Sequence, residues 1–283
     1  MAFIFAGCEK DNNKGTLKLS ITDAPIDSEN VTGVFISITD IQYHVSGNNF
    51  ASFSDFEGPK KFNLLDLTRG ATELLGNLEM EPGTHTQLRF ILDAPVYGTG
   101  NPMNPGCYIG FEDGTTQPLF VPSGFQTGFK GVGTFTVPVN GTVEVTADFD
   151  VRKSVVEAGV SGMYILKPTI RLVVDNQAGK IVGGVTNIPE GKGIIIFAYE
   201  EGAYTANEAN EPPLETPRFP NAISSDMVDD AGNYHIDFLA PKTYDLILVA
   251  LENGEFDQVL GTVEDVVVES KKTTSQSIDI NNL

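Results

Sequence analysis

The chain has very few cysteines and no tryptophan. Its two cysteines are Cys8 and Cys107, and 18 phenylalanines supply most of the aromatic bulk. If Cys8 is acylated, as its surroundings predict below, Cys107 has no partner and no internal disulfide holds the fold. The fold must then rest on hydrophobic burial, and 283 residues are enough for two domains with a core each. Cys107 itself is expected to be a small buried residue at the start of a strand.

Basic residues are also scarce. Lys and Arg number 18 against 38 Asp and Glu, which gives a formal net charge of −20. Nucleic acid is therefore not an expected partner, because its binding needs a basic footprint. An anionic membrane would repel the body of the protein, so membrane attachment would have to come from a lipid. The charge suits solubility outside the cytoplasm.

Long apolar runs are absent. No stretch approaches the roughly 20 apolar residues that a transmembrane helix needs, and long segments with a helical period are missing. Short runs of Val, Ile, Thr and Phe recur instead, separated by Gly, Pro, Asn and Asp. This pattern predicts an all-β protein with two tandem β-sandwich domains and at most short helical turns.

Alternating segments predict individual strands in the first half. Residues 16–23 read as a half-buried strand, and a phase slip at Thr39-Asp40 predicts a β-bulge in the next. The clearest local signal is Asn140-Gly141 between two alternating runs, which predicts a type I′ hairpin. Residues 62–67 are expected to form a short strand, and residues 68–75 one or two helical turns.

The polar segment 175–179 predicts a domain boundary. Residues 1–14 then form a signal and tether, 15–175 a first β-sandwich and 179–283 a second. Residues 193–199 are continuously apolar, which predicts a central strand. Residues 200–222 are the exception, because a loop this long is usually functional or disordered.

Both halves contain a corner in which a proline precedes a strand that starts with a ring. His85 follows Pro82 in the first half, and Tyr244 follows Pro241 in the second. Such rings often seal the corner of a sandwich through a hydrogen bond. We therefore expect a structural role for both rings.

The N-terminus resembles the lipobox of bacterial lipoproteins. The apolar run Met1–Phe5 leads through Ala6-Gly7 to Cys8, and a polar stretch follows. The resemblance implies acylation of Cys8 and attachment to the membrane through a stable lipid anchor. Only seven residues precede Cys8 and none is basic, so either the recorded start lies downstream of the true one or the run is a chance apolar N-terminus.

The first half resembles the bacterial domain of unknown function 4382. The segments that carry the resemblance run in order along residues 15–174; they are 15–25, 64–67, 81–89, 121–130, 148–150 and 165–171. The family is frequent in lipoproteins and offers no catalytic residues to carry over. This chain departs from it at His85, where the family more often has Tyr, which weakens the expected hydroxyl bond.

The second half is similar to the carboxypeptidase regulatory-like, transthyretin-like β-sandwich. The motifs are residues 179–185, 229–236 and 239–246. Lys242 stands where that family usually has Gly. The resemblance implies an accessory module that neither cuts peptides nor needs zinc, and with it the expected fold becomes two immunoglobulin-like or transthyretin-like sandwiches.

Metal and catalytic signals are weak. Three separated histidines and the lack of HExxH and CxxC motifs give no support for zinc, and no cofactor is expected. Asp226, Asp229 and Asp230 are weak calcium candidates, but a β-turn rich in Asp and Gly explains them without an ion. Asp148 and Asp150 share the outward face of a strand and are expected to be solvent-side charges.

One loop supports a binding hypothesis. Two aromatic rings lie beside amide, hydroxyl and ammonium groups, a combination that suits a sugar or peptide; the residues are Phe125, Gln126, Thr127, Phe129 and Lys130. The favoured alternative is that both rings fill the core under the loop.

The sequence therefore predicts a non-enzymatic lipoprotein of the bacterial cell envelope, on the outer membrane, that serves as a binding, adhesive or structural module. The first alternative is a carbohydrate- or protein-binding component of an uptake or surface assembly, with loop 200–222 as a candidate site. The second is a hydrolase, which would need a cleft with clustered, perturbed carboxylates or histidines.

Overall fold

The computed structural model describes residues 13–24, 30–46, 49–98, 100, 102, 104–122, 128–159 and 162–283. Its secondary structure is nearly all β, as the sequence predicts. The elements before residue 175 are β1 (Gly15–Ala24), β2 (Val31–Ser46), β3 (Asn49–Ser52), β4 (Lys60–Asn63), the 3-10 helix η1 (Leu64–Leu67), β5 (Glu73–Met80), β6 (Gly83–Leu92), β7 (Tyr108–Phe111), β8 (Thr116–Phe120), β9 (Phe129–Val137), β10 (Thr142–Asp150), α1 (Val151–Ser154), β11 (Val155–Glu157), β12 (Tyr164–Leu166) and β13 (Ile170–Val174).

Fewer elements follow residue 178, and they form a separate set. They are β14 (Gly179–Thr186), β15 (Lys192–Glu200), the 3-10 helix η2 (Ala206–Ala209), β16 (Ser224–Met227), β17 (Asn233–Leu239), β18 (Thr243–Glu252), β19 (Glu255–Val267), β20 (Thr273–Ser275), β21 (Ile278–Asp279) and the 3-10 helix η3 (Ile280–Asn282). No sheet among the described residues takes strands from both sets.

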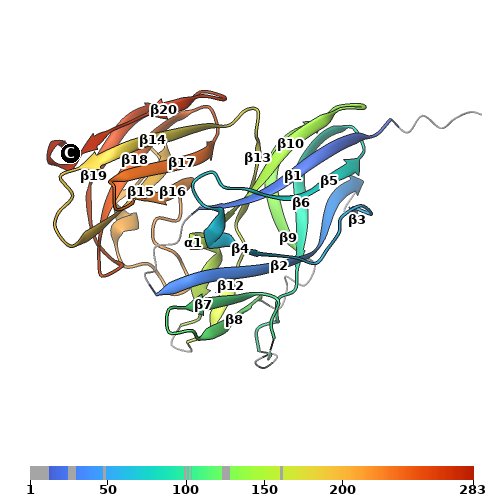
Figure 1. Ribbon diagram of the computed structural model, residues 1–283, viewed down its shortest axis with the longest axis horizontal. Coiled ribbons are helices and arrows are strands. Elements are labelled where there is room, and N and C mark those ends of the chain that lie inside the picture. The colour runs from blue at the N-terminus through green and yellow to red at the C-terminus, as the bar shows by residue number, and fades with distance from the viewer. Residues whose placement is uncertain are drawn as a thin grey trace, which may run out of the picture.

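The first half is built on one large sheet. Its strand order is β11-β12-β8-β7-β2-β6-β9-β13-β10-β1-β5, with β3 and β4 also paired to β2. Side chains from strands far apart in this order, such as Leu17 and Leu78 of β1 and β5 and Ile36 and Leu88 of β2 and β6, belong to a single buried cluster. The sheet is therefore bent over itself around one core (Figure 1).

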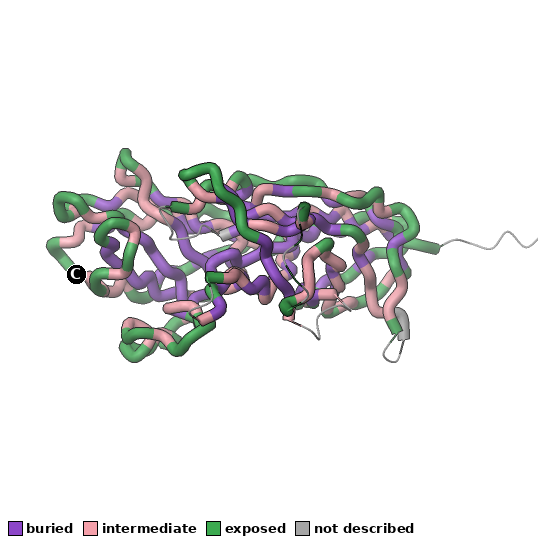
Figure 2. Tube along the Cα trace, turned by 90° about the horizontal axis from the view of Figure 1, so that it is seen from below, coloured by how far each residue is buried: buried purple, intermediate pink, exposed green. Residues whose placement is uncertain are grey.

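The second half is a sandwich of two four-stranded sheets. One sheet has the order β17-β14-β20 with β21 beside β14, and the other has the order β16-β15-β18-β19. Inward side chains of both sheets, including Ile181 and Ile236 from one and Ile196 and Leu248 from the other, form the core between them. Figure 2 shows that buried segments run through the interior of both halves.

Residues 200–222 cover the outer face of the second sheet. Phe219, 2 % exposed, packs against Phe197 with 4.6 Å between ring centroids, and the cluster continues to Ile247 and Val249. The central strands β15 and β18 are consequently buried on both faces, which explains their continuous apolar sequences. The long loop is therefore a cover for the sheet.

The Asn140-Gly141 hairpin prediction is wrong. The turn exists, since Gly141 N–H donates to Pro138 O at 3.3 Å and Asn140 has a φ of 54°. However, β9 and β10 do not pair with each other, because β13 lies between them, parallel to β9 and antiparallel to β10. The inward face of β10 is as predicted, with Val145 and Phe149 fully buried.

Residues 62–75 also differ from their prediction. The strand β4 ends at Asn63, whose side chain accepts a hydrogen bond from Leu65 N–H and starts η1. The expected helical turns are absent, and Glu73 opens the strand β5 instead. The β-bulge at Thr39-Asp40 is confirmed by a register shift between Ile38 and Asp40.

Both predicted corners are confirmed. Tyr244 Oη donates to Ala240 O at 2.9 Å, and His85 Nε2 lies 3.0 Å from Glu81 O. Each ring thus reaches the carbonyl four residues before it. His85 also stacks on Phe135, with 5.5 Å between ring centroids, so imidazole replaces the phenol at this corner.

Candidate functional site

The predicted binding loop lies mostly outside the described residues, namely at Phe125, Gln126 and Thr127. Phe129 is 3 % exposed and belongs to the core of the first half, so its ring is not part of a surface. Lys130 is exposed on β9 opposite Arg89. The described part of this loop therefore agrees with the core-filling alternative.

The three calcium candidates divide between the interior and the surface. Asp226 is 1 % exposed, Asp229 is half-buried and Asp230 is exposed. Asp229 Oδ1 accepts from the N–H groups of Ala231 and Asn233, which is the expected Asp-rich turn. In the part of the chain that the structure describes, no three His, Cys, Asp or Glu residues are grouped to hold a metal ion.

Of the two cysteines, Cys107 is among the described residues. Cys8 lies outside the described residues. Cys107 is fully buried just before β7, as predicted. Burial raises the pKa of the Cys107 thiol to about 12. The thiol is therefore protonated at neutral pH and a poor nucleophile, since reactivity follows the thiolate.

The most conspicuous polar site is the joint between the two halves, and Arg69 forms one side of it. Arg69 follows η1 and reaches into the second half. Its Nη1 donates to Asp229 Oδ2 at 3.1 Å, its Nη2 to Met227 O at 2.6 Å, and its Nε lies 3.4 Å from Asp226. Asp226 also accepts from His235 N–H at 2.7 Å. One guanidinium thus binds three acceptors of β16 and the turn that follows it.

Arg152 lies at the centre of the joint and is 6 % exposed. Its Nη1 donates to the carbonyl oxygens of Arg218 and Phe219, at 3.1 and 2.9 Å, and its Nη2 to Asp150 Oδ2 at 3.2 Å. Its guanidinium carbon lies 5.0 Å from the centroid of the Phe197 ring. A planar guanidinium suits such a site, because it combines fixed donors with an apolar face.

The short helix α1 holds these cations in place. Asp150 caps α1 by accepting from Lys153 N–H, and Asp23 Oδ1 accepts from Val151 N–H at 3.0 Å. Lys153 Nζ donates to Ala222 O and lies 3.2 Å from Asp150 Oδ2. Burial lowers the pKa of Lys153, and the Asp150 carboxylate opposes that shift.

Arg171 and Lys167 complete the joint. Arg171 Nη1 donates to Phe238 O at 2.9 Å, and its Nη2 binds the buried carboxylate of Asp148. Burial raises the pKa of Asp148, and Arg171 opposes that shift. Lys167 Nζ binds Glu215 at 2.9 Å in an exposed pair. Five basic side chains of the described first half therefore donate to the second half.

The expectation of solvent-side charges at Asp148 and Asp150 is wrong. They are 5 % and 6 % exposed, because the second half covers the end of β10. Each carboxylate pairs with an arginine of its own half, which leaves further guanidinium donors for the other half. The only local signal in the sequence is Arg152, two residues after Asp150, because the partner of Asp148 is the distant Arg171.

The cavity at the joint is too small for a substrate. It lies among Asp23, Asp148, Ser225, His235 and Asp237 and has a volume of about 10 Å³. That is room for one water molecule. The perturbed carboxylates of the joint therefore do not line a cleft of the kind that the hydrolase alternative requires.

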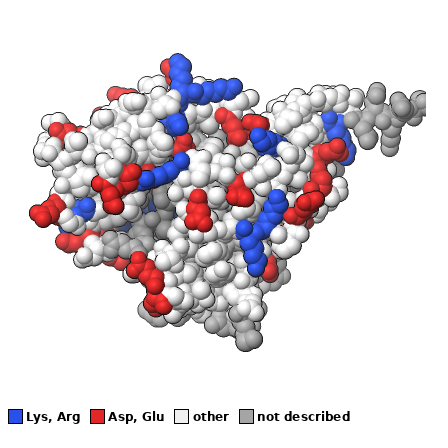
Figure 3. Space-filling view, in the orientation of Figure 1, with Lys and Arg blue, Asp and Glu red and all other residues white. Residues whose placement is uncertain are grey.

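Surface charge marks no single site on the face seen in Figure 3. Acidic side chains are scattered over both halves, and the few basic ones lie among them. Among the described residues, no helix has the length and apolar character needed to cross a membrane.

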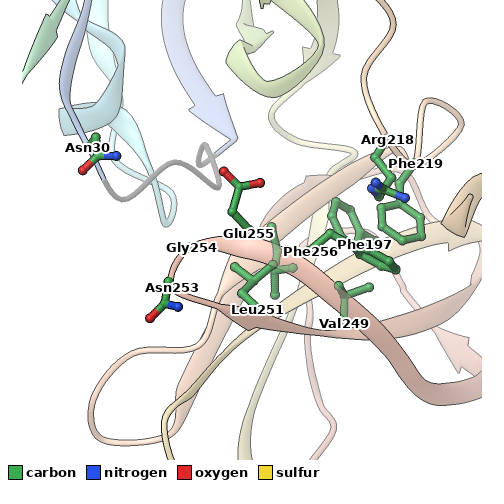
Figure 4. Close-up of a pocket in the computed structure, with 11 residues that line it drawn as sticks. Asn30, Phe197, Arg218, Phe219, Val249, Leu251, Asn253, Gly254, Glu255 and Phe256 are labelled. Atoms are coloured by element: carbon green, nitrogen blue, oxygen red, sulfur yellow. The ribbon is translucent and has the colours of Figure 1, made fainter. Parts of the chain in front are cut away.

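A second candidate site is a pocket of about 210 Å³ beside the joint (Figure 4). Its walls are aromatic and aliphatic side chains from β15, β18, β19 and the end of loop 200–222; they are Ile195, Phe197, Phe219, Val249, Leu251 and Phe256. Phe256 is half-buried, and the Arg218 guanidinium carbon lies 4.1 Å from its ring centroid. Arg218 is itself held by the carbonyl oxygens of Ala209 and Asn210.

The rim of this pocket is polar. Asn253 and Gly254 form the β18–β19 turn with φ values of 51° and 75°, and Glu255 follows them. Asn30, from the first half, also lines the pocket, and in Figure 4 it lies apart from the other labelled residues. Sequence reasoning pointed to loop 200–222 but missed this turn, although Asn253-Gly254 is the dipeptide that favours two positive φ values.

Comparison with protein families identifies the first half of the chain. Residues 14–168, more than half of the chain, match the family described as "Domain of unknown function (DUF4382)". Among curated proteins, none matches.

Several solved structures show a distant likeness. The minor pilin GBS52 of Streptococcus agalactiae is 11% identical, with 93% of this chain and 94% of that chain covered and a TM-score of 0.24. The shaft pilin SpaA of Lactobacillus rhamnosus GG is 14% identical, with 93% and 97% covered and a TM-score of 0.21. The Bacillus anthracis TIE protein is 11% identical with a TM-score of 0.23; 94% of this chain is covered, but only 34% of that one. Scores this low carry no argument about function.

Proposed function

The chain belongs to the DUF4382 family, and from that premise we propose that it is a non-enzymatic spacer that displays its second half at the bacterial cell envelope. The observation that carries the proposal is the joint. Arg69, Arg152 and Arg171 of the first half bind carbonyl and carboxylate oxygens of the second. A joint built from buried, directional bonds fixes the angle between two halves, whereas a bare linker leaves it free.

The covalent connection supports the same proposal. The segment between β13 and β14 is short, and Gln177 and Ala178 both donate to Val174 O. β1 begins at the end of the first half that lies away from the second half (Figure 1). An attachment before β1 would hold the second half at a distance. We propose residues 15–175 and 179–283 as the two domains, the latter a transthyretin-like sandwich.

Inter-half distances test the rigid joint. Spin labels at Val139→Cys and Val267→Cys, which are 58 % and 55 % exposed, sample the two halves in a Cys8→Ala background, in which buried Cys107 stays unlabelled. We expect one narrow distance distribution in the parent protein. Arg152→Met and Arg171→Met should broaden it, because each removes donors to carbonyl oxygens of the second half. Arg171→Met also leaves the buried Asp148 carboxylate without its arginine, at a cost of about 3–5 kcal/mol.

The matched control is Lys18→Met. Lys18 pairs with Glu144 on the exposed surface of the first half, at 2.8 Å and away from the joint, so its loss should leave the distribution narrow. A broad distribution in the parent protein, or equal broadening by the control, would contradict the rigid spacer.

We propose that Cys8 carries the anchor and that the protein is an outer-membrane lipoprotein. The support is the apolar run, the two small residues and the polar tether around Cys8. Metabolic labelling with a fatty-acid analogue in the native host should modify the parent protein and not Cys8→Ala. Equal labelling of both proteins, or of neither, would remove the anchor from the proposal.

A further inference from the structure

We propose that the pocket between the β18–β19 turn and Arg218 binds one sugar residue of an uncharged glycan. This inference goes beyond the spacer role and does not rest on it. It is carried by three properties of the pocket: its size, its aromatic walls and its polar rim.

The size selects a small group. The volume of about 210 Å³ is below the roughly 300–1,000 Å³ of sites that enclose drug-sized ligands. One ring fits, and a longer ligand must leave through the mouth. A second hollow of about 550 Å³ shares Asn30 with the pocket and continues along Phe111 and Thr115 of the first half.

The walls offer apolar contact to a ring. Phe219 and Phe256 lie with their centroids 5.9 Å apart, and Phe197 lies 4.6 Å from Phe219. Phe256 is the only one of the three that is more than slightly exposed. The C–H face of a sugar packs against such a ring while its hydroxyl groups point elsewhere. Phe256 therefore supplies the contact with the sugar, and the buried rings of Phe197 and Phe219 pack behind it.

The rim supplies groups that match hydroxyls. Within the described residues, no hydrogen bond occupies the side chains of Asn30, Asn253 or Glu255. The amides offer donors and acceptors and the carboxylate offers acceptors, and a sugar hydroxyl is both donor and acceptor. A wholly apolar ligand would leave these groups desolvated and unpaired.

The charged groups around the pocket disfavour an anionic ligand. Arg218 is the cation of the pocket, but it already binds two backbone carbonyl oxygens and the Glu211 carboxylate at 3.1 Å. Glu255 and the net charge of −20 repel anions. An uncharged polyol meets neither obstacle, which is why we assign a neutral glycan over an acidic one.

Ligand-observed NMR tests the assignment. Saturation transfer from the intact protein to the methyl glycosides of glucose, galactose, mannose and N-acetylglucosamine should appear for at least one of them. Binding should weaken about tenfold or more in Phe256→Ala, because the ring contact is lost. Asn253→Gly keeps the turn, since glycine also accepts its positive φ, but removes the amide and should weaken binding too. Tyr97→Ala removes a ring that is 40 % exposed in the first half and should change nothing.

Three outcomes overturn the proposal. They are no transfer to any of the four glycosides, transfer that survives both pocket variants, and transfer only to N-acetylphenylalanine amide, which stands for a peptide side chain. If Phe256→Ala fails to fold by circular dichroism, Asn253→Gly and Glu255→Gln decide alone, because both sites are exposed. None of these results bears on the inter-half distances, so the spacer role stands or falls separately.

Discussion

Asp226 is the residue at which burial and charge conflict most clearly. It is 1 % exposed, and its neighbours Arg69 and His235 N–H both favour the charged form. Burial nevertheless outweighs them and raises the pKa of Asp226 from its ordinary 3.8 to about 6. Arg69 is partly exposed, so solvent weakens its attraction for the carboxylate. The joint therefore keeps a charge that costs stability at neutral pH.

The sign of this shift gives a pH prediction. A carboxyl group with a raised folded-state pKa binds a proton more tightly when folded, so its cost is present above about pH 6 and disappears towards pH 4. Asp226→Asn keeps an acceptor for His235 N–H and removes the charge. We expect the variant to be more stable than the parent protein at pH 7, by up to roughly 3 kcal/mol.

Urea unfolding of both proteins at several pH values measures this. The advantage of Asp226→Asn should shrink as the pH falls from 7 to 5, and the comparison cancels the contributions of the other titrating groups, which both proteins share. An advantage that does not change with pH, or a variant that is less stable at pH 7, would show that the Arg69 pair dominates instead.

Asp148 and Asp150 show how far the alternation of side chains along a strand predicts their surroundings. The sequence places Asp148 and Asp150 on one face of β10 correctly, opposite to Val145 and Phe149. Parity states which face a side chain takes, but not what covers that face. Here the second half covers it, and the two carboxylates become buried partners of arginines.

At the scale of elements, the dipeptide Asn-Gly gives two different outcomes. At residues 253–254 it closes the hairpin between β18 and β19, whose residues Glu252 and Glu255 pair directly. At residues 140–141 it only turns the chain, because β13 returns later and takes the place between β9 and β10. Turn chemistry is local and was readable from sequence, whereas strand order depends on a segment some thirty residues away.

The corners at His85 and Tyr244 were also predictable from local sequence, whereas the role of loop 200–222 was not. The rings of His85 and Tyr244 bond within four residues, so their role followed from the sequence. The role of loop 200–222 did not, because Phe219 finds its partners on β15 and β18. Local bonds are predictable from local sequence, and a cover is visible only once the face beneath it is known.

At the scale of the whole molecule, the sequence predicted the all-β class and the resemblance of the first half to the matched family. It did not predict the joint. The donors Arg69, Arg152 and Arg171 are far apart in sequence, and their acceptors are mostly backbone carbonyl oxygens, which no side-chain pattern reveals. The aromatic pocket was missed for the same reason, since its walls come from separate strands.

The placement of β1 has a mechanical consequence. β1 pairs along its length with β10 in parallel and with β5 in antiparallel orientation, and its last residues Thr22 and Asp23 reach the joint. Tension between an anchor before Asn13 and the C-terminal half would act along this strand. Its hydrogen bonds on both sides would then be sheared together and not opened one after another.

Single-molecule pulling separates the two geometries. Attachment at Asn13 and at the C-terminus shears β1, whereas attachment at Asn13 and Val139→Cys pulls on neighbouring ends of β1 and β10, because Asn140 N–H donates to Lys14 O. We expect a markedly higher rupture force in the first geometry. Equal forces would mean that β1 does not bear the load. If the forces differ as expected, β1 is the element that bears the mechanical load on the molecule.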